Sequence, residues 1–449
     1  MHRSVIVLAT HGEDALHSRP PATQPLLGQP VVGYVLDAVE TLKTDCSLLV
    51  TCAAGPAVTD YLANRAGTPI TLVDLAGAPT SNSGLVSAVR ALPQPEGTVV
   101  VLGGDIPLLR PSVLEALVTA HESTGAAATM LTLPHGAPDP AEGCAVLAVD
   151  TRFLTAAVNK LATEGRSATT GPEDVLRFLQ DEHLKVAMLP VADALDLVRC
   201  VEPIALAQAG LVLRQRINDA WLRSGVRIVE PQGVWIDATV HLEAGALLEP
   251  GVILRGCTSV AAHTVIGPDT TLIDTKVRSG AHVLRTHAVE SIIGEGASVG
   301  PFAHLRPGTK LGEDTRIGTF VEVKETTVGN GTQVAHLAYV GNATIGTAVN
   351  IGAGTTFTLY DGVRKHSTKV GDAAFIGCQT SLVAPVEIGA GAFTAAGSVI
   401  TQDVPPGALA VERGEQRNVA GWVARRRAGT PWAAAAAAAR GTTIDDTDT

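Results

Sequence analysis

The sequence predicts an α/β domain followed by a parallel β-helix, and two patterns carry this prediction. Through residues 1–204, short apolar runs of strand length alternate with segments of helical periodicity, which indicates a mainly parallel sheet covered by helices. From about Val234 to about Ala410, an aliphatic residue followed by glycine recurs in a six-residue rhythm. Such a short repeat is typical of parallel strands that stack as the coils of a β-helix.

The first domain is predicted element by element from its apolar runs. Strands are expected at Val5–Leu8, Ser47–Thr51, Ile70–Val73, Val99–Leu102 and Ala127–Leu133. Helices are expected at Val31–Leu42, Pro56–Ala66 and Pro111–Ser123. A single helix over Pro203–Leu222 then leads out of this domain, and we place a linker at residues 205–230.

The β-helix is placed at residues 231–415 because the aliphatic–glycine pairs keep one phase through most of it. One aliphatic side chain per turn should point inward, and glycine should stand where a Cβ would clash. Residues 416–449 form an extension with seven consecutive alanines, for which we expect a frayed or partly disordered tail. The pairs are Ile293-Gly294, Val299-Gly300, Leu311-Gly312, Ile317-Gly318, Ile345-Gly346, Ile351-Gly352, Val370-Gly371, Ile376-Gly377 and Ile388-Gly389.

Composition excludes several classes of protein. Among the 449 residues, 46% are hydrophobic and 17% charged, which is ample for large cores. The net charge is −11 and no basic stretch alternates with aromatic residues, so nucleic-acid binding is not expected. The six cysteines form no C-x-x-C pair and are read as reduced thiols. The apolar run at Ser4–Ala9 is too short for a signal peptide or a membrane span, so we expect a cytoplasmic protein that does not bind membranes.

Five motifs in the C-terminal half occur in an order and spacing that resemble the bifunctional GlmU family. In that family a left-handed β-helix acetylates glucosamine 1-phosphate from acetyl-CoA. A Rossmann-like nucleotidyltransferase domain then transfers UMP from UTP, giving UDP-N-acetylglucosamine. The resemblance also implies a homotrimer with cofactor sites between subunits. The motifs are Gly300-Pro-Phe-Ala-His-Leu-Arg-Pro-Gly308, Phe320-Val-Glu-Val-Lys324, His336-Leu-Ala-Tyr339, Val349-Asn-Ile-Gly-Ala-Gly354 and Tyr360-Asp-Gly362.

Amide formation from an amino sugar requires a base, because a protonated amine cannot attack a thioester. Histidine titrates near neutral pH and suits this role. The resemblance makes His336 the catalytic base, with Glu322 as the group that could orient its ring. It also assigns the sugar phosphate to Arg306 and Lys324, whose charges suit a phosphate, and to Tyr339, Asn350 and Lys365.

The resemblance places acetyl-CoA against Ala353, Leu359, Tyr360, Cys378, Ala396 and Arg413. A backbone N–H near Ala353 could stabilise the oxyanion of the tetrahedral intermediate. Two of these positions depart from the family, since Leu359 replaces an asparagine and Cys378 replaces a serine. Leucine cannot make the hydrogen bonds of asparagine, so we expect weaker binding of acetyl-CoA.

The nucleotide-binding loop of the first domain departs from the family more strongly. The family has Leu-Ala-Ala-Gly-x-Gly-Thr-Arg-Met after its first strand, where this chain reads Leu8-Ala-Thr-His-Gly-Glu-Asp-Ala-Leu16. Glu13 and Asp14 place negative charge where a triphosphate should bind, and Ala15 replaces the arginine. Arg19 is the nearby candidate to replace a missing lysine.

The remaining loop motifs of this domain are altered as well, with one exception. The family loop that contacts uracil and ribose is replaced by Thr80–Leu85. Its Gly-Tyr-Gly-Arg motif is replaced by Glu142–Ala145, and the motif that supplies a magnesium ligand is replaced by Cys200–Ile204. Gly103-Gly-Asp-Ile-Pro107 survives after its strand. The resemblance makes Asp105 a Mg²⁺ ligand, with Glu202 as a second candidate. The alternative is that this motif is only a retained turn.

Three functions are therefore open. The leading one is an acetyltransferase whose uridylyltransferase domain is impaired. The second is a fully bifunctional enzyme in which Arg19 and Asp105 compensate and UTP is still used. The third is a non-catalytic relative that binds a sugar phosphate, which Leu359 and Cys378 would favour.

Overall fold

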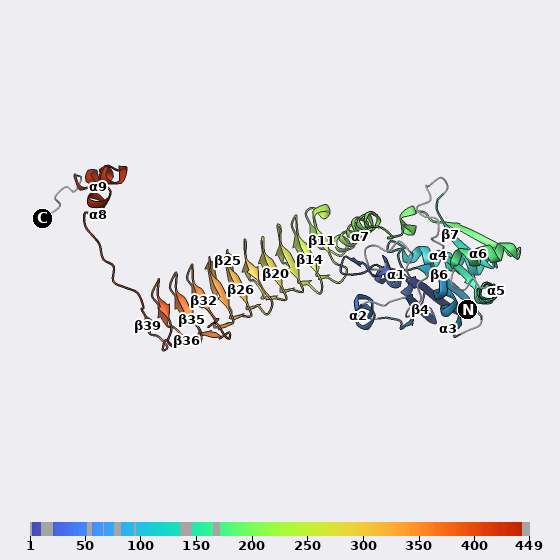
Figure 1. The fold of residues 1–449 in the computed structure, drawn as a ribbon, viewed down its shortest axis with the longest axis horizontal. Coiled ribbons are helices and arrows are strands. Elements are labelled where there is room, and N and C mark those ends of the chain that lie inside the picture. The colour runs from blue at the N-terminus through green and yellow to red at the C-terminus, as the bar shows by residue number, and fades with distance from the viewer. Residues whose placement is uncertain are drawn as a thin grey trace.

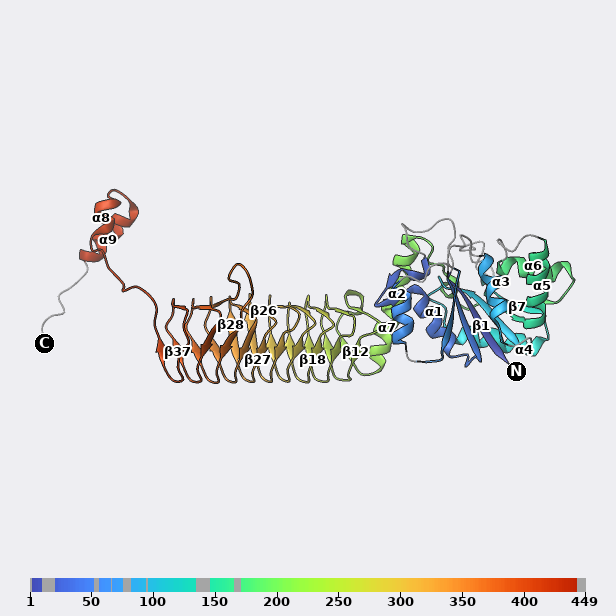
Figure 2. The ribbon, with the colours of Figure 1, turned by 60° about the horizontal axis from the view of Figure 1, so that its bottom comes forward.

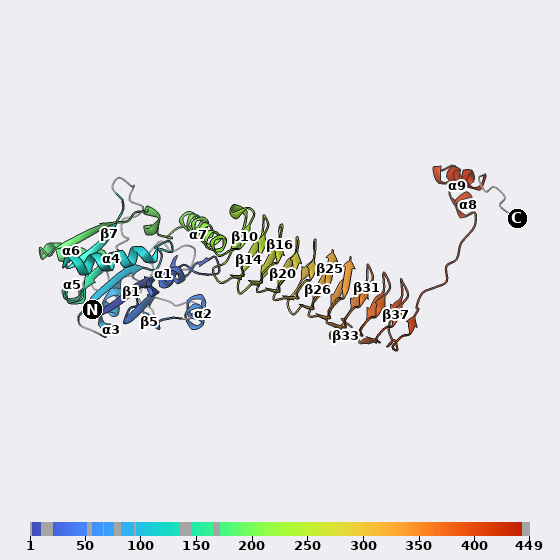
Figure 3. The ribbon, with the colours of Figure 1, turned by 180° about the vertical axis from the view of Figure 1, so that it is seen from behind.

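The computed structural model describes residues 2–9, 21–51, 56–65, 67–75, 82–93, 96–134, 146–164 and 171–441. Figure 1 shows an N-terminal domain of helices around a sheet, a long regular coil, and two short helices at the C-terminal end. The same three parts are seen from behind in Figure 3. Among the described residues, no helix combines the length and the apolar character that crossing a membrane requires.

The sheet of the N-terminal domain has the strand order β5-β4-β1-β6-β8-β7-β9. All neighbouring pairs are parallel except those of β8, which runs antiparallel to β6 and β7. The five predicted strands are confirmed, whereas β8 and β9 were not predicted. The bounds are β1 Arg3–Ala9, β4 Cys46–Thr51, β5 Ile70–Asp74, β6 Thr98–Gly103, β7 Ala128–Thr132, β8 Leu147–Asp150 and β9 Val186–Pro190.

Helices cover both faces of this sheet, because successive residues of its central strands point to opposite sides. Val5 of β1 packs in one apolar cluster with α1 and α4, and Ile6 packs in the other with α3, α5 and α6. The helices are α1 Val31–Glu40, α2 Pro56–Asn64, α3 Asn82–Ala91, α4 Pro111–Thr124, α5 Thr151–Thr163 and α6 Pro172–Asp181.

Helix α7 (Pro203–Arg223) joins the two large parts of the chain. Its first half packs through Ala209 and Leu213 against Leu26 and Val31 of the first domain. Its second half contacts the β-helix, where the amide of Asn218 donates to two backbone carbonyls of the first coil at 2.8 and 3.0 Å. The helix therefore fixes the start of the coil.

The β-helix contains three parallel sheets of 11, 10 and 9 strands, which we name the first, second and third face. It runs from β10 (Arg227–Ile228) to β39 (Leu409–Ala410), and each strand pairs with the strand one coil further on. Strands of the first face near the candidate site are β25 Arg316–Thr319, β28 Gln333–His336, β31 Asn350–Ile351, β34 Phe375–Ile376 and β37 Phe393–Thr394. Those of the second face are β23 His304–Leu305, β26 Glu322–Lys324, β29 Tyr339–Gly341 and β32 Thr356–Thr358.

Inward aliphatic side chains and close-packed glycines build the coil as predicted. Val334, Val340 and Ile345, which come from three successive faces, are all buried. A Cβ on Gly318 would overlap the backbone oxygen of Ala335 in the next coil, and one on Gly294 would overlap that of Gly312. Glycine is therefore required at these positions because the backbone of the next coil lies too close to leave room for a Cβ. A positive φ is not the reason.

A further set of buried residues was not predicted, and it consists of threonines that lie at all three corners of the coils. Their hydroxyls donate to backbone carbonyls at the coil corners, several of which also accept from a backbone N–H. Thr332 is fully buried, donates to the carbonyl of Gly346 at 2.7 Å and accepts from the N–H of Val349 at 3.0 Å. Corresponding threonines are Thr258, Thr264, Thr270, Thr275, Thr286, Thr309, Thr315, Thr326, Thr355 and Thr380.

Beyond β39 the chain leaves the coil and forms α8 (Trp422–Arg426) and α9 (Pro431–Gly441). The alanine run, for which we expected a frayed tail, is helical through Gly441, in keeping with the high helix propensity of alanine. These helices contact each other and stand away from the coil (Figure 1).

Thr332→Val should lower the free energy of unfolding by about 1–3 kcal/mol, because it keeps the shape of the side chain and leaves Gly346 and Val349 without their partner. Thr327→Val is the matched control, since Thr327 is exposed in the same coil and should change the value by less than about 0.5 kcal/mol. Urea unfolding of both variants measures the difference. Equal effects would show that the buried hydroxyl does not stabilise the corner.

Candidate active site

The register of the first face stacks several predicted site residues into one column. Ile317, Val334, Ile351, Ile376 and Thr394 are register partners in successive coils. The residues two positions later therefore lie above one another, at the corner between the first and second faces. This column, which we name the corner column, contains Thr319, His336, Ala353, Cys378 and Ala396.

Backbone hydrogen bonds link neighbouring coils along the corner column, and three of its side chains are exposed. The N–H of Gln379 donates to the carbonyl of Ala353 at 2.7 Å, and that of Gly397 to the carbonyl of Cys378 at 2.8 Å. The guanidinium of Arg413 reaches the carbonyl of Ala396 at 3.3 Å. His336, Cys378 and Ala396 are exposed. The corner column thus aligns the predicted base with three of the six predicted acetyl-CoA residues, and a fourth, Arg413, contacts the carbonyl of one of them.

Three predicted cations converge at the next corner, between the second and third faces. Arg306 lies beside Lys324 in the register of β23 and β26, and its N–H donates to the carbonyl of Val323 at 2.8 Å. The Lys324 side chain, and more weakly Arg306, lowers the pKa of Lys365, whereas Glu325, which lies 3.4 Å from the Lys324 ammonium, opposes this shift. We name Arg306, Lys324 and Lys365 the cation cluster. It suits a phosphate dianion, which would relieve the repulsion between like charges.

A loop that leaves the coil carries Lys365 to the cation cluster (Figure 2). Asp361 holds this loop by accepting from the N–H groups of Val363 and Arg364, each at 2.8 Å, and from Nε2 of His366 at 2.7 Å. Three hydrogen bonds, from the backbone N–H of Arg364, the ring of His366 and the backbone N–H of Val363, lower the pKa of Asp361 to about 2. The carboxylate is therefore ionised at neutral pH. His366 was not predicted, although an aspartate five residues before it in an exposed loop was a signal for the pair.

Leu359 and Tyr360, the remaining predicted acetyl-CoA residues, lie at the base of this loop. The carbonyl of Leu359 accepts from the N–H of His366 at 2.7 Å. A Cβ on Gly341 would meet the Leu359 side chain at 2.7 Å, so Leu359 packs against that glycine beside Lys324. Leu359 therefore has a packing role in this loop. Tyr360 is exposed, and its hydroxyl donates to the carbonyl of Gly362 at 2.7 Å.

Glu322 does not contact His336, contrary to the expectation that it orients the ring. Its carboxylate accepts from Arg306 at 2.9 Å. In the register it lies between His304 and Tyr339 on the second face, whereas His336 ends a strand of the first face. Within one chain, Glu322 therefore orients Arg306 in the cation cluster.

The predicted sugar-phosphate residues are divided between two faces. Tyr339 lies on the second face, next to Glu322 and close to Arg306. Asn350 lies on the first face, half-buried between Gln333 and Phe375. The corner column and the cation cluster are thus separated, within one chain, by the width of the second face.

Apolar side chains form an exposed ladder directly beside His336. Phe302 and Phe320 stack with ring centroids 5.4 Å apart, and Leu337 holds the equivalent position in the next coil. They are 52%, 59% and 63% exposed. A contiguous apolar surface of this kind marks an interaction site.

The altered nucleotide loop of the first domain lies outside the described residues. This applies to Glu13, Asp14, Ala15 and Arg19, and to the segment Glu142–Ala145. Thr80 and Ser81 lie outside them too. No geometry is therefore assigned to these predicted positions.

Asp105 is described, and its surroundings do not fit the predicted Mg²⁺ site. Arg199 donates to its Oδ2 through Nε at 2.9 Å and through a terminal nitrogen at 2.7 Å. Glu202, the second candidate ligand, is exposed at the start of α7. Within the described ranges, no three His, Cys, Asp or Glu residues gather as metal ligands. Mg²⁺ prefers octahedral oxygen coordination, and this carboxylate already carries a guanidinium.

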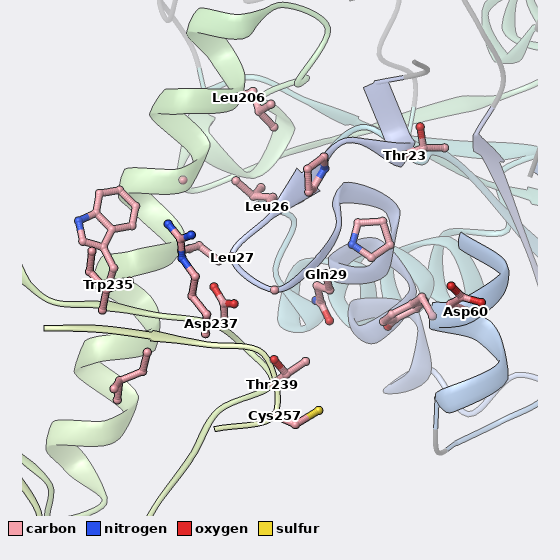
Figure 4. Close-up of a pocket in the computed structure, with 18 of the residues that line it drawn as sticks. Thr23, Leu26, Leu27, Gln29, Asp60, Leu206, Trp235, Asp237, Thr239 and Cys257 are labelled. Atoms are coloured by element: carbon pink, nitrogen blue, oxygen red, sulfur yellow. The ribbon is translucent and has the colours of Figure 1, made fainter. Parts of the chain in front are cut away.

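A pocket of about 1510 Å³ lies where the first domain, α7 and the first coils meet (Figure 4). Its walls include Leu26 and Leu27 of the hairpin β2–β3 (Pro25–Leu26 and Gln29–Pro30), Leu206 of α7, and Trp235 and Asp237 of the first coil. None of the predicted site residues lines it.

Comparison with known proteins finds two family models that match different parts of the chain. The family model described as MobA-like NTP transferase domain matches residues 18–168, and the bacterial transferase hexapeptide (six repeats) matches residues 290–325. The latter is consistent with the expected left-handed coil.

Full-length relatives carry the description "Bifunctional protein GlmU". The one from Corynebacterium efficiens is 40% identical over 415 residues, covering 86% of this chain and 85% of the relative. That from Mycolicibacterium smegmatis is 42% identical over 365 residues, covering 74% and 75%. That from Streptomyces avermitilis is 37% identical over 462 residues, covering 96% of each. At this identity and coverage, the chain belongs to the family of bifunctional GlmU proteins.

Proposed function

We propose that this protein transfers the acetyl group of acetyl-CoA to the amino group of glucosamine 1-phosphate. The observation that carries the proposal is the pairing of two arrangements at neighbouring corners of the coil. The corner column aligns a histidine with positions for an extended cofactor, and the cation cluster gathers three positive charges suited to a sugar phosphate.

In this mechanism the residues of the chain move one proton and hold two ligands. His336 takes a proton from the amino group, and the freed nitrogen forms a bond to the thioester carbon. A backbone N–H near Ala353 stabilises the oxyanion. The nitrogen then releases its second proton to water, the oxyanion re-forms the carbonyl as the C–S bond breaks, and the His336 imidazolium returns its proton to the sulfur of coenzyme A. Arg306, Lys324 and Lys365 hold the phosphate, with Glu322 fixing the guanidinium of Arg306.

We propose that three copies of the chain assemble through the β-helix and complete the site between subunits. Two features support this assembly. The base and the cation cluster lie at different corners of one chain, and an exposed apolar ladder flanks the base. A second copy seated on Phe302, Phe320 and Leu337 would cover this surface and bring its own cation cluster toward His336.

We propose that uridylyl transfer by the first domain is impaired. Two observations support this impairment. Glu13 and Asp14 are acidic residues in the nucleotide loop, and the carboxylate of Asp105 is paired with the guanidinium of Arg199. The alternative is a fully bifunctional enzyme that uses UTP and a divalent metal ion. It is favoured by the description of the relatives and by the complete sheet that carries the loops.

His336→Ala should lower the turnover number of acetyl transfer by about 10²-fold or more, the usual scale for loss of a general base. His282→Ala is the matched control, because His282 is an exposed histidine of the first face several coils away. Coenzyme A release, followed with a thiol reagent, measures both. An unchanged turnover number in His336→Ala would contradict the assignment, and absence of turnover in the wild type would favour a non-catalytic sugar-phosphate-binding protein.

The Michaelis constant for glucosamine 1-phosphate should rise as the solution becomes alkaline. The rise should begin at a pH below the ordinary pKa range of lysine. The pKa of Lys365 is lowered by Lys324, so Lys365 loses its proton early as the pH rises, and the phosphate loses a partner. Lys365→Arg stays charged and should give a flat profile over the same interval. Steady-state kinetics across this range compare the two proteins. Superimposable profiles would show that Lys365 does not hold the phosphate.

Pyrophosphate release from UTP and N-acetylglucosamine 1-phosphate, with Mg²⁺ present, tests the state of the first domain. We expect turnover close to the background rate, because the loop charge opposes triphosphate binding. Acetyl transfer by the same preparation is the control for folding. Clear Mg²⁺-dependent turnover would favour the bifunctional alternative.

A further inference from the structure

We infer that Arg199 supplies, as a fixed side chain, the positive charge beside Asp105 that a divalent cation would otherwise provide, and that it keeps such cations out. This inference deepens the proposed impairment of uridylyl transfer and rests on that proposal. It does not depend on acetyl transfer, which occurs at the other end of the chain.

The backbone holds Asp105 in place at the carboxyl end of central strand β6. The N–H of Gly104 donates to the carbonyl of Leu8 in neighbouring β1 at 2.8 Å. The carbonyl of Asp105 accepts from the N–H of Cys200 at 2.8 Å. Asp105 is therefore tied to the segment that precedes α7, and Arg199 lies in that segment, directly beside Cys200.

The ion pair is largely removed from water and concentrated on one oxygen. The Asp105 side chain is 11% exposed and that of Arg199 is 29% exposed. The two guanidinium bonds that Arg199 makes to Asp105 end on Oδ2, whereas Oδ1 is buried and has no hydrogen-bond partner among the described residues. A buried carboxylate requires a positive partner, and the Arg199 guanidinium is such a partner for Asp105.

A divalent cation would be unfavourable at this position for two reasons. It would lie close to the guanidinium, and repulsion between like charges is strong where water is excluded. Only Oδ1 of Asp105 is left to bind it, whereas Mg²⁺ and Mn²⁺ require several oxygen ligands. Arg199 therefore places a permanent positive charge beside Asp105, where an exchangeable metal ion would otherwise bind.

A second ion pair in the same domain, whose carboxylate is buried, provides a matched control. Arg110 contacts both oxygens of Asp196, with Nε to Oδ1 at 2.8 Å and a terminal nitrogen to Oδ2 at 2.6 Å. Asp196 is fully buried and no oxygen of its carboxylate remains without a partner. Neutralising Arg110 thus disturbs a comparable pair but does not touch Asp105.

Titration of the full-length protein with Mn²⁺, followed by electron paramagnetic resonance of the free ion, tests the inference. The wild type and Asp105→Asn should bind Mn²⁺ equally weakly. Arg199→Gln keeps an N–H donor but removes the charge, and it should bind Mn²⁺ at least about tenfold more tightly than the wild type. The gain should vanish in the double variant Arg199→Gln, Asp105→Asn, and Arg110→Gln should show no gain.

Two results would overturn the inference. One is Mn²⁺ binding by the wild type that is lost in Asp105→Asn, because the ion would then coexist with Arg199. The other is no gain in Arg199→Gln while circular dichroism and acetyl transfer remain at wild-type levels. If the wild-type protein shows no acetyl transfer, the proposed function is contradicted. The present test stays valid in that case, because it measures metal binding alone.

Discussion

The in-register stacking of the coils is the constraint on which the candidate site depends. Each strand pairs with the same positions one coil later, so a residue at one corner is repeated above and below by its register partners. Close-packed glycines and buried threonine hydroxyls maintain the corners. A shift of one residue would turn inward aliphatic side chains to solvent. The register therefore sets the stability of the coil and the alignment of His336, Ala353, Cys378 and Ala396.

The first domain follows a different rule, in which core and loops are separable. Its central strands alternate side chains between two apolar clusters, so the sheet depends on residues such as Val5 and Ile6. The residues that would contact a nucleotide follow the strands and contribute little to either cluster. Substitution in these loops can abolish an activity and leave the fold intact. The Asp105–Arg199 pair fits this picture, because it keeps the strand-end turn and changes the charge beside it.

Much of the fold could be predicted because its signals are local and periodic. The six-residue spacing predicts the coil, and the glycine pairs predict where backbones approach. Antiparallel β8 could not be predicted, since its short apolar run carries no information about direction. The buried threonines were also missed, because threonine in a strand is common on exposed surfaces and only the three-dimensional corner shows which carbonyl it contacts.

The site could be predicted only as far as a motif names its residues. The motifs predict Arg306 and Lys324, the resemblance adds Lys365, and in the structure Lys324 is the main cause of the lowered pKa of Lys365. The roles of Glu322 and Arg199 depend on a pairing between coils, as for Glu322 and Arg306, or across 94 residues of sequence, as for Asp105 and Arg199. Such pairings leave no pattern in the sequence itself. For Glu322 and Asp105, the contacts in the structure differ from the roles that the family resemblance implies.

Subunit mixing tests most directly the claim that the stacked coils make half-sites that a second copy completes. Chains carrying His336→Ala and chains carrying Lys324→Ala should each be nearly inactive alone. When the two are co-expressed in equal amounts, each site would draw its base and its cations from different subunits, and about a quarter of the sites would be intact. Recovery of about a quarter of the wild-type acetyl transfer is the predicted result. Activity no higher than that of the separate variants would contradict the account, because base and cation cluster would then act within one chain.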